Sequence, residues 1–154
     1  MHELEIYPLV TDCRGIDAGL WHYRTDDHTL ELIAEPGPLL DTLVARARAA
    51  AVMTADPQVV LLVTARFGRV MFKYETIAYA LIAKHVGVLY QTLYLVATAM
   101  DLAICGLGGG DADTFAAASG LDYLLEGTVG ELVLGSRPPG PDANDAWSGE
   151  DARP

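Results

Sequence analysis

Three groups of residues in the sequence have types and spacing that could carry chemistry. The first comprises Arg66-Phe67-Gly68-Arg69 and Phe72-Lys73-Tyr74, which places three cations and a phenol close together. If Arg69 and Lys73 share a helix, their like charges lie four residues apart, repel each other and favour a neutral lysine amine. A neutral lysine beside Tyr74 is a usable general base. The alternative is a polar helix start whose long side chains extend into water.

The second group is a glycine cluster formed by Gly106 and Gly108-Gly109-Gly110, which Asp111 follows. Glycines allow backbone N–H groups to approach a phosphate or a flat ring, and a helix that starts at Asp111 favours an anion at its N-terminus. The cluster does not fit the dinucleotide-binding GxGxxG pattern, and it is not a P-loop because no Lys-Ser/Thr follows. A tight connection between two elements is the alternative.

The third group is the polar pair Gln91-Thr92, which interrupts an apolar stretch. A buried amide needs a hydrogen-bond partner, and a cofactor edge, a partner chain or the chain's own backbone can supply it. The four histidines show no metal-ligand spacing, and the two cysteines form no CxxC pair. We therefore expect no metal site.

The composition narrows the classes of function. The chain has 154 residues, which suffices for one domain with a single core. Its formal net charge of -11 disfavours a nucleic-acid partner, because phosphate binding needs clustered positive charge. The acidic start at Glu3 and Glu5 is unlike a signal peptide, and the apolar run over residues 86–100 is short for a membrane span. We expect a cytoplasmic protein without a membrane partner.

Periodicity predicts the elements that position these groups. Residues 4–10 form a strand, residues 19–23 and 29–33 a hairpin, and residues 39–52 a helix. Residues 58–65 contain the unbroken apolar run Val59-Val60-Leu61-Leu62-Val63, which is typical of a strand in the middle of a sheet. Residues 112–119 form a helix capped by Asp111 and closed by Gly120, and residues 128–134 form a final strand.

A long helix is expected between the strand at residues 58–65 and the helix at residues 112–119. No proline occurs over residues 73–102 and the only glycine is Gly87, which permits one helix of roughly 25 to 30 residues. Its apolar residues surround it almost completely, so it needs a sheet on one side and a partner subunit on the other. We therefore expect a homodimer. Residues 136–154 are acidic and rich in proline and glycine, and we expect them to be a disordered tail.

In this order, the segments resemble the SagB-type dehydrogenases of the nitroreductase superfamily over residues 2–135. The matching segments are His2-Glu3-Leu4-Glu5-Ile6-Tyr7, Ala18-Gly19-Leu20-Trp21-His22-Tyr23, Phe72-Lys73-Tyr74-Glu75, Gly87-Val88-Leu89-Tyr90-Gln91-Thr92-Leu93-Tyr94-Leu95 and Gly106-Leu107-Gly108-Gly109-Gly110-Asp111. The resemblance implies an α+β, nitroreductase-like fold over residues 1–135, with a central sheet and a long central helix at the interface of a homodimer. It also implies FMN as the cofactor.

The resemblance assigns roles to individual residues. Many family members oxidise thiazolines and oxazolines in peptides to thiazoles and oxazoles, and Lys73-Tyr74 matches their Lys-Tyr pair, which helps to remove a ring proton while hydride passes to the flavin. The other implied cofactor-binding residues are Gly108, Gly109, Gly110 and Gln91. Family domains carry an Arg-x-Ser-x-Arg phosphate clamp ahead of the first matching segment, and this sequence lacks it. Arg69 is the replacement candidate that we select, and Arg66 and Arg137 are the others.

Two other functions are compatible with the same residues. A truncated relative could serve as a non-catalytic dimerisation or scaffold subunit of a biosynthetic complex. A general nitro- or quinone-reducing flavoprotein would use the same cofactor with NAD(P)H as the electron donor. Other biosynthetic enzymes are expected partners in peptide natural-product synthesis.

Overall fold

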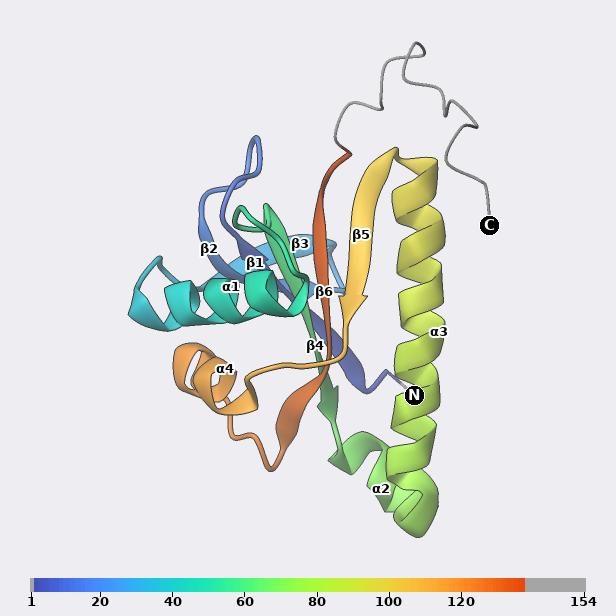
Figure 1. The fold of residues 1–154 in the computed structure, drawn as a ribbon. Coiled ribbons are helices and arrows are strands. Elements are labelled where there is room, and N and C mark those ends of the chain that lie inside the picture. The colour runs from blue at the N-terminus through green and yellow to red at the C-terminus, as the bar shows by residue number, and fades with distance from the viewer. Residues whose placement is uncertain (1, 138–154) are drawn as a thin grey trace, which may run out of the picture.

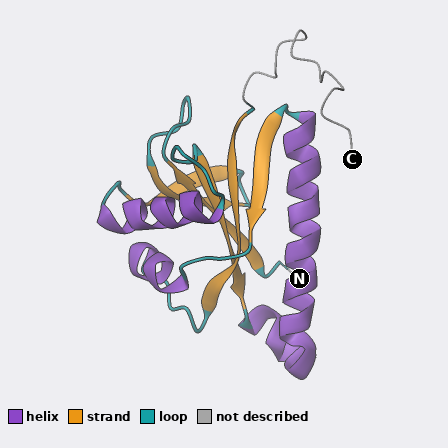
Figure 2. Cartoon of the chain, in the orientation of Figure 1, coloured by secondary structure: helices purple, strands orange, loops and turns teal. Residues whose placement is uncertain are grey.

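The computed structural model describes residues 2–137, which form one six-stranded sheet with helices on both faces (Figure 1). The strand order is β3-β2-β1-β4-β6-β5, and every neighbouring pair is antiparallel. Helices α1 and α4 cover one face and α3 covers the other (Figure 2). The predicted α+β class, with a central sheet and a long helix, is confirmed.

The elements have the following bounds. The strands are β1 (Leu4–Val10), β2 (Gly19–Arg24), β3 (Thr29–Ala34), β4 (Val59–Arg66), β5 (Leu102–Leu107) and β6 (Glu126–Ser136). The helices are α1 (Pro38–Ala50), α2 (Gly68–Tyr74), α3 (Ala78–Ala99) and α4 (Ala112–Ser119), with a short 3₁₀ turn over Glu75–Ile77.

The predicted central strand and hairpin are both confirmed. β4 lies between β1 and β6, and its residues from Val60 to Ala65 are buried because helices cover both faces of the sheet. β2 and β3 pair with each other, with Tyr23 opposite Leu30.

The face beneath α1 and α4 holds the largest apolar core. Leu40 and Leu43 of α1 and Phe115 of α4 pack there against the sheet. The local signals for α4 act as predicted: the Asp111 side chain accepts a hydrogen bond from the Thr114 N–H at 3.0 Å, and Gly120 ends the helix in the left-handed conformation at φ 72°.

Helix α3 packs on the opposite face through only part of its surface. Ile82 and Val86 are buried against the sheet, whereas Val88, Leu95 and Met100 are exposed. The helical segment Gly68–Ala99 is long and apolar enough to pass for a membrane span, with a mean hydropathy of 1.3 and 11% of the tested window buried. Core helices of soluble proteins pass the same test. Nothing within residues 2–137 covers the outer face of α3.

The expectation of one helix over residues 73–102 is wrong in its bounds. α2 ends at Tyr74 because Glu75 adopts φ 35°, and α3 begins four residues later, at Ala78. Asp101 adopts φ 56° and turns the chain into β5, a strand that the sequence analysis missed. Gly106 therefore lies in a strand.

The boundary of the expected tail is also shifted. Ser136, which we expected in the tail, is the last residue of β6. The rest of that prediction concerns residues 138–154, which lie outside the described residues.

Candidate functional site

The three glycines that follow β5 border a cavity of about 350 Å³ at the edge of the sheet. We call this the glycine-loop cavity; its lining residues are Tyr79, Tyr90, Leu107, Gly108, Gly109, Gly110, Ala112, Thr128, Val129, Gly130 and Glu131. They come from the start and middle of α3, the β5–α4 connection and β6. The sheet edge thus joins the predicted glycine cluster to residues far away in the sequence.

The glycines in this region are explained in two different ways. A Cβ on Gly130 would lie 2.7 Å from the Tyr90 hydroxyl, and a Cβ on Gly106 would lie 3.0 Å from the Tyr90 ring, so these two positions must stay small for Tyr90 to pack. A Cβ on Gly108 or Gly109 would meet nothing within 4 Å, and neither residue has a positive φ. The fold itself therefore does not require glycine at positions 108 and 109.

Tyr90 lines the cavity, and two hydrogen bonds to the Glu131 backbone hold its side chain in place. Its hydroxyl donates to the Glu131 carbonyl at 3.0 Å and accepts from the Glu131 N–H at 2.5 Å. The sequence analysis missed Tyr90 and Glu131 as site residues. Tyr90 stands next to the predicted Gln91, but one residue along a helix changes the direction of the side chain, so proximity in sequence was not a sufficient signal.

Glu131 lines the cavity, and Asp111, which lies between the lining residues Gly110 and Ala112 in the chain, has a carboxyl group in a contrasting environment. Glu131 is 6% exposed, and burial together with the nearby Asp111 charge raises the pKa of Glu131 to about 7. Asp111 accepts two hydrogen bonds from Thr114, from its hydroxyl and its N–H, and pairs with Arg46 at 2.7 Å. These interactions lower the pKa of Asp111, the Thr114 hydroxyl having the largest effect. Asp111 is therefore ionised at neutral pH while Glu131 is partly protonated.

Lys73 and Tyr74, the residues predicted to act as the catalytic base, do not line the glycine-loop cavity of the same chain. Lys73 and Tyr74 end α2, with the Lys73 ammonium 5.3 Å from the centre of the Tyr74 ring. Arg69 shares α2 with Lys73, which was the condition for the repulsion considered above, but its guanidinium bonds to the Glu5 carboxylate and the His2 carbonyl. Gln91 is exposed on α3. None of these four residues lines the cavity.

A buried polar network joins β1, β4 and β6 near the start of α2. The Glu126 carboxylate accepts hydrogen bonds from the Tyr7 hydroxyl at 2.9 Å, from the Thr64 hydroxyl at 2.7 Å and from Arg66 Nε at 2.8 Å. Arg66 also pairs with Glu5 at 3.1 Å. Burial, followed by the Glu126 charge, raises the pKa of Tyr7, which remains a neutral donor. The network fixes the end of β4, from which the chain enters the helix that carries Lys73.

A second, polar cavity of about 360 Å³ adjoins this network. Arg66 and Arg69 line it together with Glu5 and His22. The carboxylates already neutralise the two cations, since Glu5 pairs with both arginines and with His22. Arg66 and Arg69 therefore already form ion pairs with carboxylates of the same chain.

The residues of the glycine-loop cavity fit the ring of a flavin better than its phosphate. Open backbone at Gly108 and Gly109 leaves room for a flat ring, and Tyr79 and Tyr90 add aromatic surface. Among residues 2–137, no lysine or arginine lines this cavity, and Arg137 pairs with Asp101 instead. A flavin phosphate bound there would need its cations from another chain or segment.

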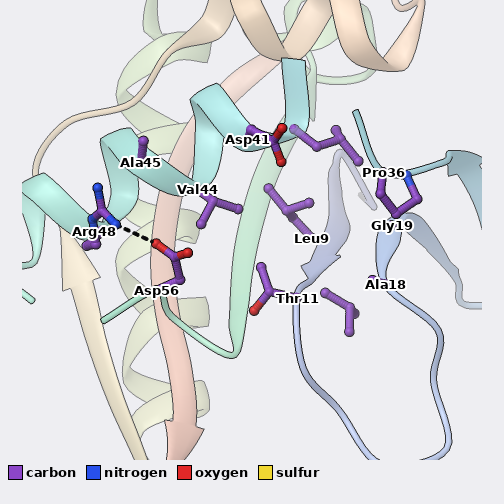
Figure 3. Close-up of a pocket in the computed structure, with 12 residues that line it drawn as sticks. Leu9, Thr11, Ala18, Gly19, Pro36, Asp41, Val44, Ala45, Arg48 and Asp56 are labelled. Carbon is purple, nitrogen blue, oxygen red and sulfur yellow. Dashed lines mark hydrogen bonds and ion pairs between the residues drawn. The ribbon is translucent and has the colours of Figure 1, made fainter. Parts of the chain in front are cut away.

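A third cavity, of about 410 Å³, lies between α1 and the ends of β1 and β2 (Figure 3). Arg48 and Asp56 form an ion pair at its edge at 2.9 Å, and Leu9 and Val44 supply apolar surface. No site residue expected from the sequence lines it. We therefore place the candidate site at the glycine loop.

A central antiparallel sheet with one long helix across a face is a nitroreductase-like α+β arrangement. The chain belongs to the nitroreductase family: the family model matches residues 1–135. Among curated proteins, none matches the chain.

Solved structures agree with this assignment. An Anabaena variabilis protein described as a nitroreductase is 25% identical, with a TM-score of 0.73, over 86% of this chain and 27% of that one. The Escherichia coli microcin synthetase McbBCD complex with truncated pro-MccB17 bound contains a chain that is 20% identical, with a TM-score of 0.76, over 89% of this chain and 53% of that one. A Ralstonia eutropha protein described as a nitroreductase is 17% identical, with a TM-score of 0.69, over 88% of this chain and 58% of that one. This chain thus spans less than two thirds of each of these structures.

Proposed function

We propose that this protein is an FMN-dependent oxidoreductase of the SagB type, which oxidises azoline rings to azoles in peptide natural products in the cytoplasm. One observation carries the proposal: Gly108 and Gly109 line a cavity and have no internal reason to be glycine. A side chain there would occupy the space that a flat ligand needs. Family membership supports FMN as that ligand.

The chemistry divides between cofactor and protein. Aromatisation of an azoline requires the loss of a proton and a hydride from neighbouring ring atoms, and a bound flavin supplies the hydride acceptor. The protein must supply the base. Lys73 is our candidate base, with Tyr74 beside it as a hydrogen-bonding group. The loop N–H groups of residues 108–110 and the Tyr90 ring would hold the flavin ring.

We further propose that two copies pair through the outer face of α3. Val88, Leu95, Val96 and Met100 form an exposed apolar surface along that helix. Burial of such a surface is favourable, and exposed apolar patches of this kind mark interaction sites. Pairing would also allow residues of one copy, including Gln91 or a cation for the phosphate, to complete the cavity of the other.

The peptide substrate class is supported by the fold likeness to the microcin synthetase chain, whose complex contains truncated pro-MccB17. Two neighbours described as nitroreductases favour the rival reaction, the reduction of nitro or quinone groups by the same cofactor with NAD(P)H as the donor.

A scaffold subunit without flavin is a second candidate function. The observation that favours it is the lack of a cation among the described residues lining the glycine-loop cavity, whose one acidic lining residue is Glu131. Under this hypothesis, α3 would still pair with a partner, and the purified protein would stay colourless when FMN is added.

FMN titration of the glycine variants separates these functions. We expect the wild-type chain to bind FMN and quench its fluorescence. Gly109→Val should weaken that affinity about tenfold to a hundredfold, equivalent to the 1–3 kcal/mol cost of overpacking. The fold should tolerate this valine because its Cβ meets nothing within 4 Å.

Gly68→Val is the matched control, since a Cβ at this position also meets open space and Gly68 does not line the cavity. Its FMN affinity should equal that of the wild type. FMN binding that Gly109→Val leaves unchanged would exclude the glycine-loop cavity as the flavin site, and no binding by the wild type would favour the scaffold.

A further inference from the structure

Glu131 is a buried carboxyl that faces a ligand-sized cavity and has no hydrogen-bond partner for its side chain within the described residues. The cross-strand partners of Glu131 are Leu62 and Leu107, both buried and apolar. A Cβ on Gly110 would lie 3.1 Å from Glu131 Oε2, so the carboxyl reaches the glycine loop itself. A group in this position will contact whatever occupies the cavity.

The surroundings of Glu131 offer little to stabilise its charge. Among the titratable groups around Glu131, only the charge of Asp111, at the start of α4, raises its pKa. The other titratable or charged residues on the neighbouring elements are Asp41, Arg46 and Arg48 on α1, Tyr79, Lys84, His85, Tyr90 and Tyr94 on α3, Cys105 on β5, Asp113 on α4 and Arg66 on β4. Arg46 is paired with Asp111, and Arg66 is paired with Glu126 and Glu5. The Tyr90 hydroxyl is used by the Glu131 backbone. Arg48 and His85 pair with Asp56 and Glu3, and Lys84 is exposed. Within residues 2–137, none of these groups forms an ion pair with the Glu131 carboxylate.

We propose that the protonation state of Glu131 controls occupancy of the glycine-loop cavity: the neutral carboxyl admits a flat ring, and the carboxylate opposes it. The inference rests on the proposed function, because the ring is taken to be that of FMN. Its physical basis is solvation. A ring that covers the cavity removes the remaining water from Glu131, and a buried charge without a partner costs several kcal/mol.

The direction of the pH dependence follows from linkage. In the free chain, burial and Asp111 raise the pKa of Glu131 to about 7. Covering the carboxyl disfavours its charged form further, so the pKa is higher in the bound state than in the free state. Binding therefore takes up a proton, and affinity is highest at low pH and falls as pH rises through about 7.

The test compares FMN affinity of the wild type and Glu131→Gln at pH 6 and pH 9. The FMN phosphate titrates in both proteins, so the ratio of the two affinities isolates Glu131. If binding raises the carboxyl pKa by about one, the wild type should lose affinity about tenfold relative to Glu131→Gln between these pH values. Asp113→Asn, at an exposed carboxylate in the first turn of α4, should keep the wild-type dependence.

A second readout requires no cofactor. Carbon-13 NMR of the glutamate carboxyls, with Glu131→Gln to assign the signal, should show a midpoint near 7 that falls in Asp111→Asn, because the like charge is gone while an asparagine can still cap α4. A midpoint near the ordinary value of 4.5 overturns the inference.

The affinity outcomes separate this inference from the proposed function. A constant affinity ratio in proteins that do bind FMN overturns the role of Glu131 and leaves the flavin site standing. Failure of both proteins to bind FMN at either pH overturns the flavin site and this inference with it.

Discussion

Lys73→Ala is expected to lower the rate of azoline oxidation about 10²- to 10⁴-fold, the usual contribution of a general base. The lysine ends α2 with its ammonium 5.3 Å from the centre of the Tyr74 ring, and it is exposed, so its removal leaves no buried group without a partner. We therefore expect the loss in turnover without a loss in stability. Tyr74→Phe should have a smaller effect on the same rate, since it removes a hydroxyl and keeps the ring.

The chain supplies its own control for this experiment. Lys84 is the only other lysine, and it is exposed on α3. Lys84→Ala should leave turnover unchanged. The measurement is single-turnover azole formation on FMN-loaded protein, followed by mass spectrometry of the peptide. Turnover that survives in both Lys73→Ala and Tyr74→Phe removes this pair from the chemistry.

Glu126→Ala is expected to destabilise the fold by about 3–5 kcal/mol, the cost of breaking a buried charge network. The substitution removes the acceptor of the Tyr7 and Thr64 hydroxyls, which are 3% and 0% exposed and have no water to replace it. The loss at Arg66 should be smaller, because its side chain is 37% exposed and retains Glu5 as a partner. Urea unfolding followed by circular dichroism measures the difference.

Two further variants define the cause of that loss. Glu126→Gln keeps an acceptor for the two hydroxyls and should fall between the wild type and Glu126→Ala. Glu35→Ala removes an exposed carboxylate and should change stability by about 0.5 kcal/mol or less. Equal stability of Glu126→Ala and Glu35→Ala would show that the network contributes nothing.

The network has a consequence for the proposed chemistry. Arg66 ends β4, and α2 begins two residues later with Lys73 in its last turn. Breaking the contacts of Arg66 loosens the junction that positions this helix. Variants at Glu126 should therefore lose activity at temperatures below those at which they unfold.

Elements with strong local signals could be predicted from the sequence. The apolar run over residues 59–63 of β4 has no polar face to present to water, and it lies in the centre of the sheet. Asp111 and Gly120 mark the two ends of α4 because a carboxylate caps an N-terminus and glycine tolerates a left-handed C-terminus. In both cases the deciding interaction is local in the chain.

The missed features depend on conformations that the residue types do not favour. Glu75 and Asp101 adopt positive φ angles without being glycine, so neither the end of α2 nor the start of β5 left a signal in the sequence. Glu131 belongs to the site because of a long-range contact. Its strand, β6, pairs with the end of β5, and this pairing brings the Glu131 carboxyl to the glycine loop. The family resemblance indicated the loop, but not the carboxyl facing it.

Hydrogen–deuterium exchange with and without FMN tests the location of the flavin most directly. We predict that FMN slows exchange over residues 106–112 and 128–131, with the amides of Gly108 and Gly109 among the protected groups. Protection confined to the cavity beneath α1 in Figure 3, or to the arginines around Glu5, would contradict a flavin site at the glycine loop.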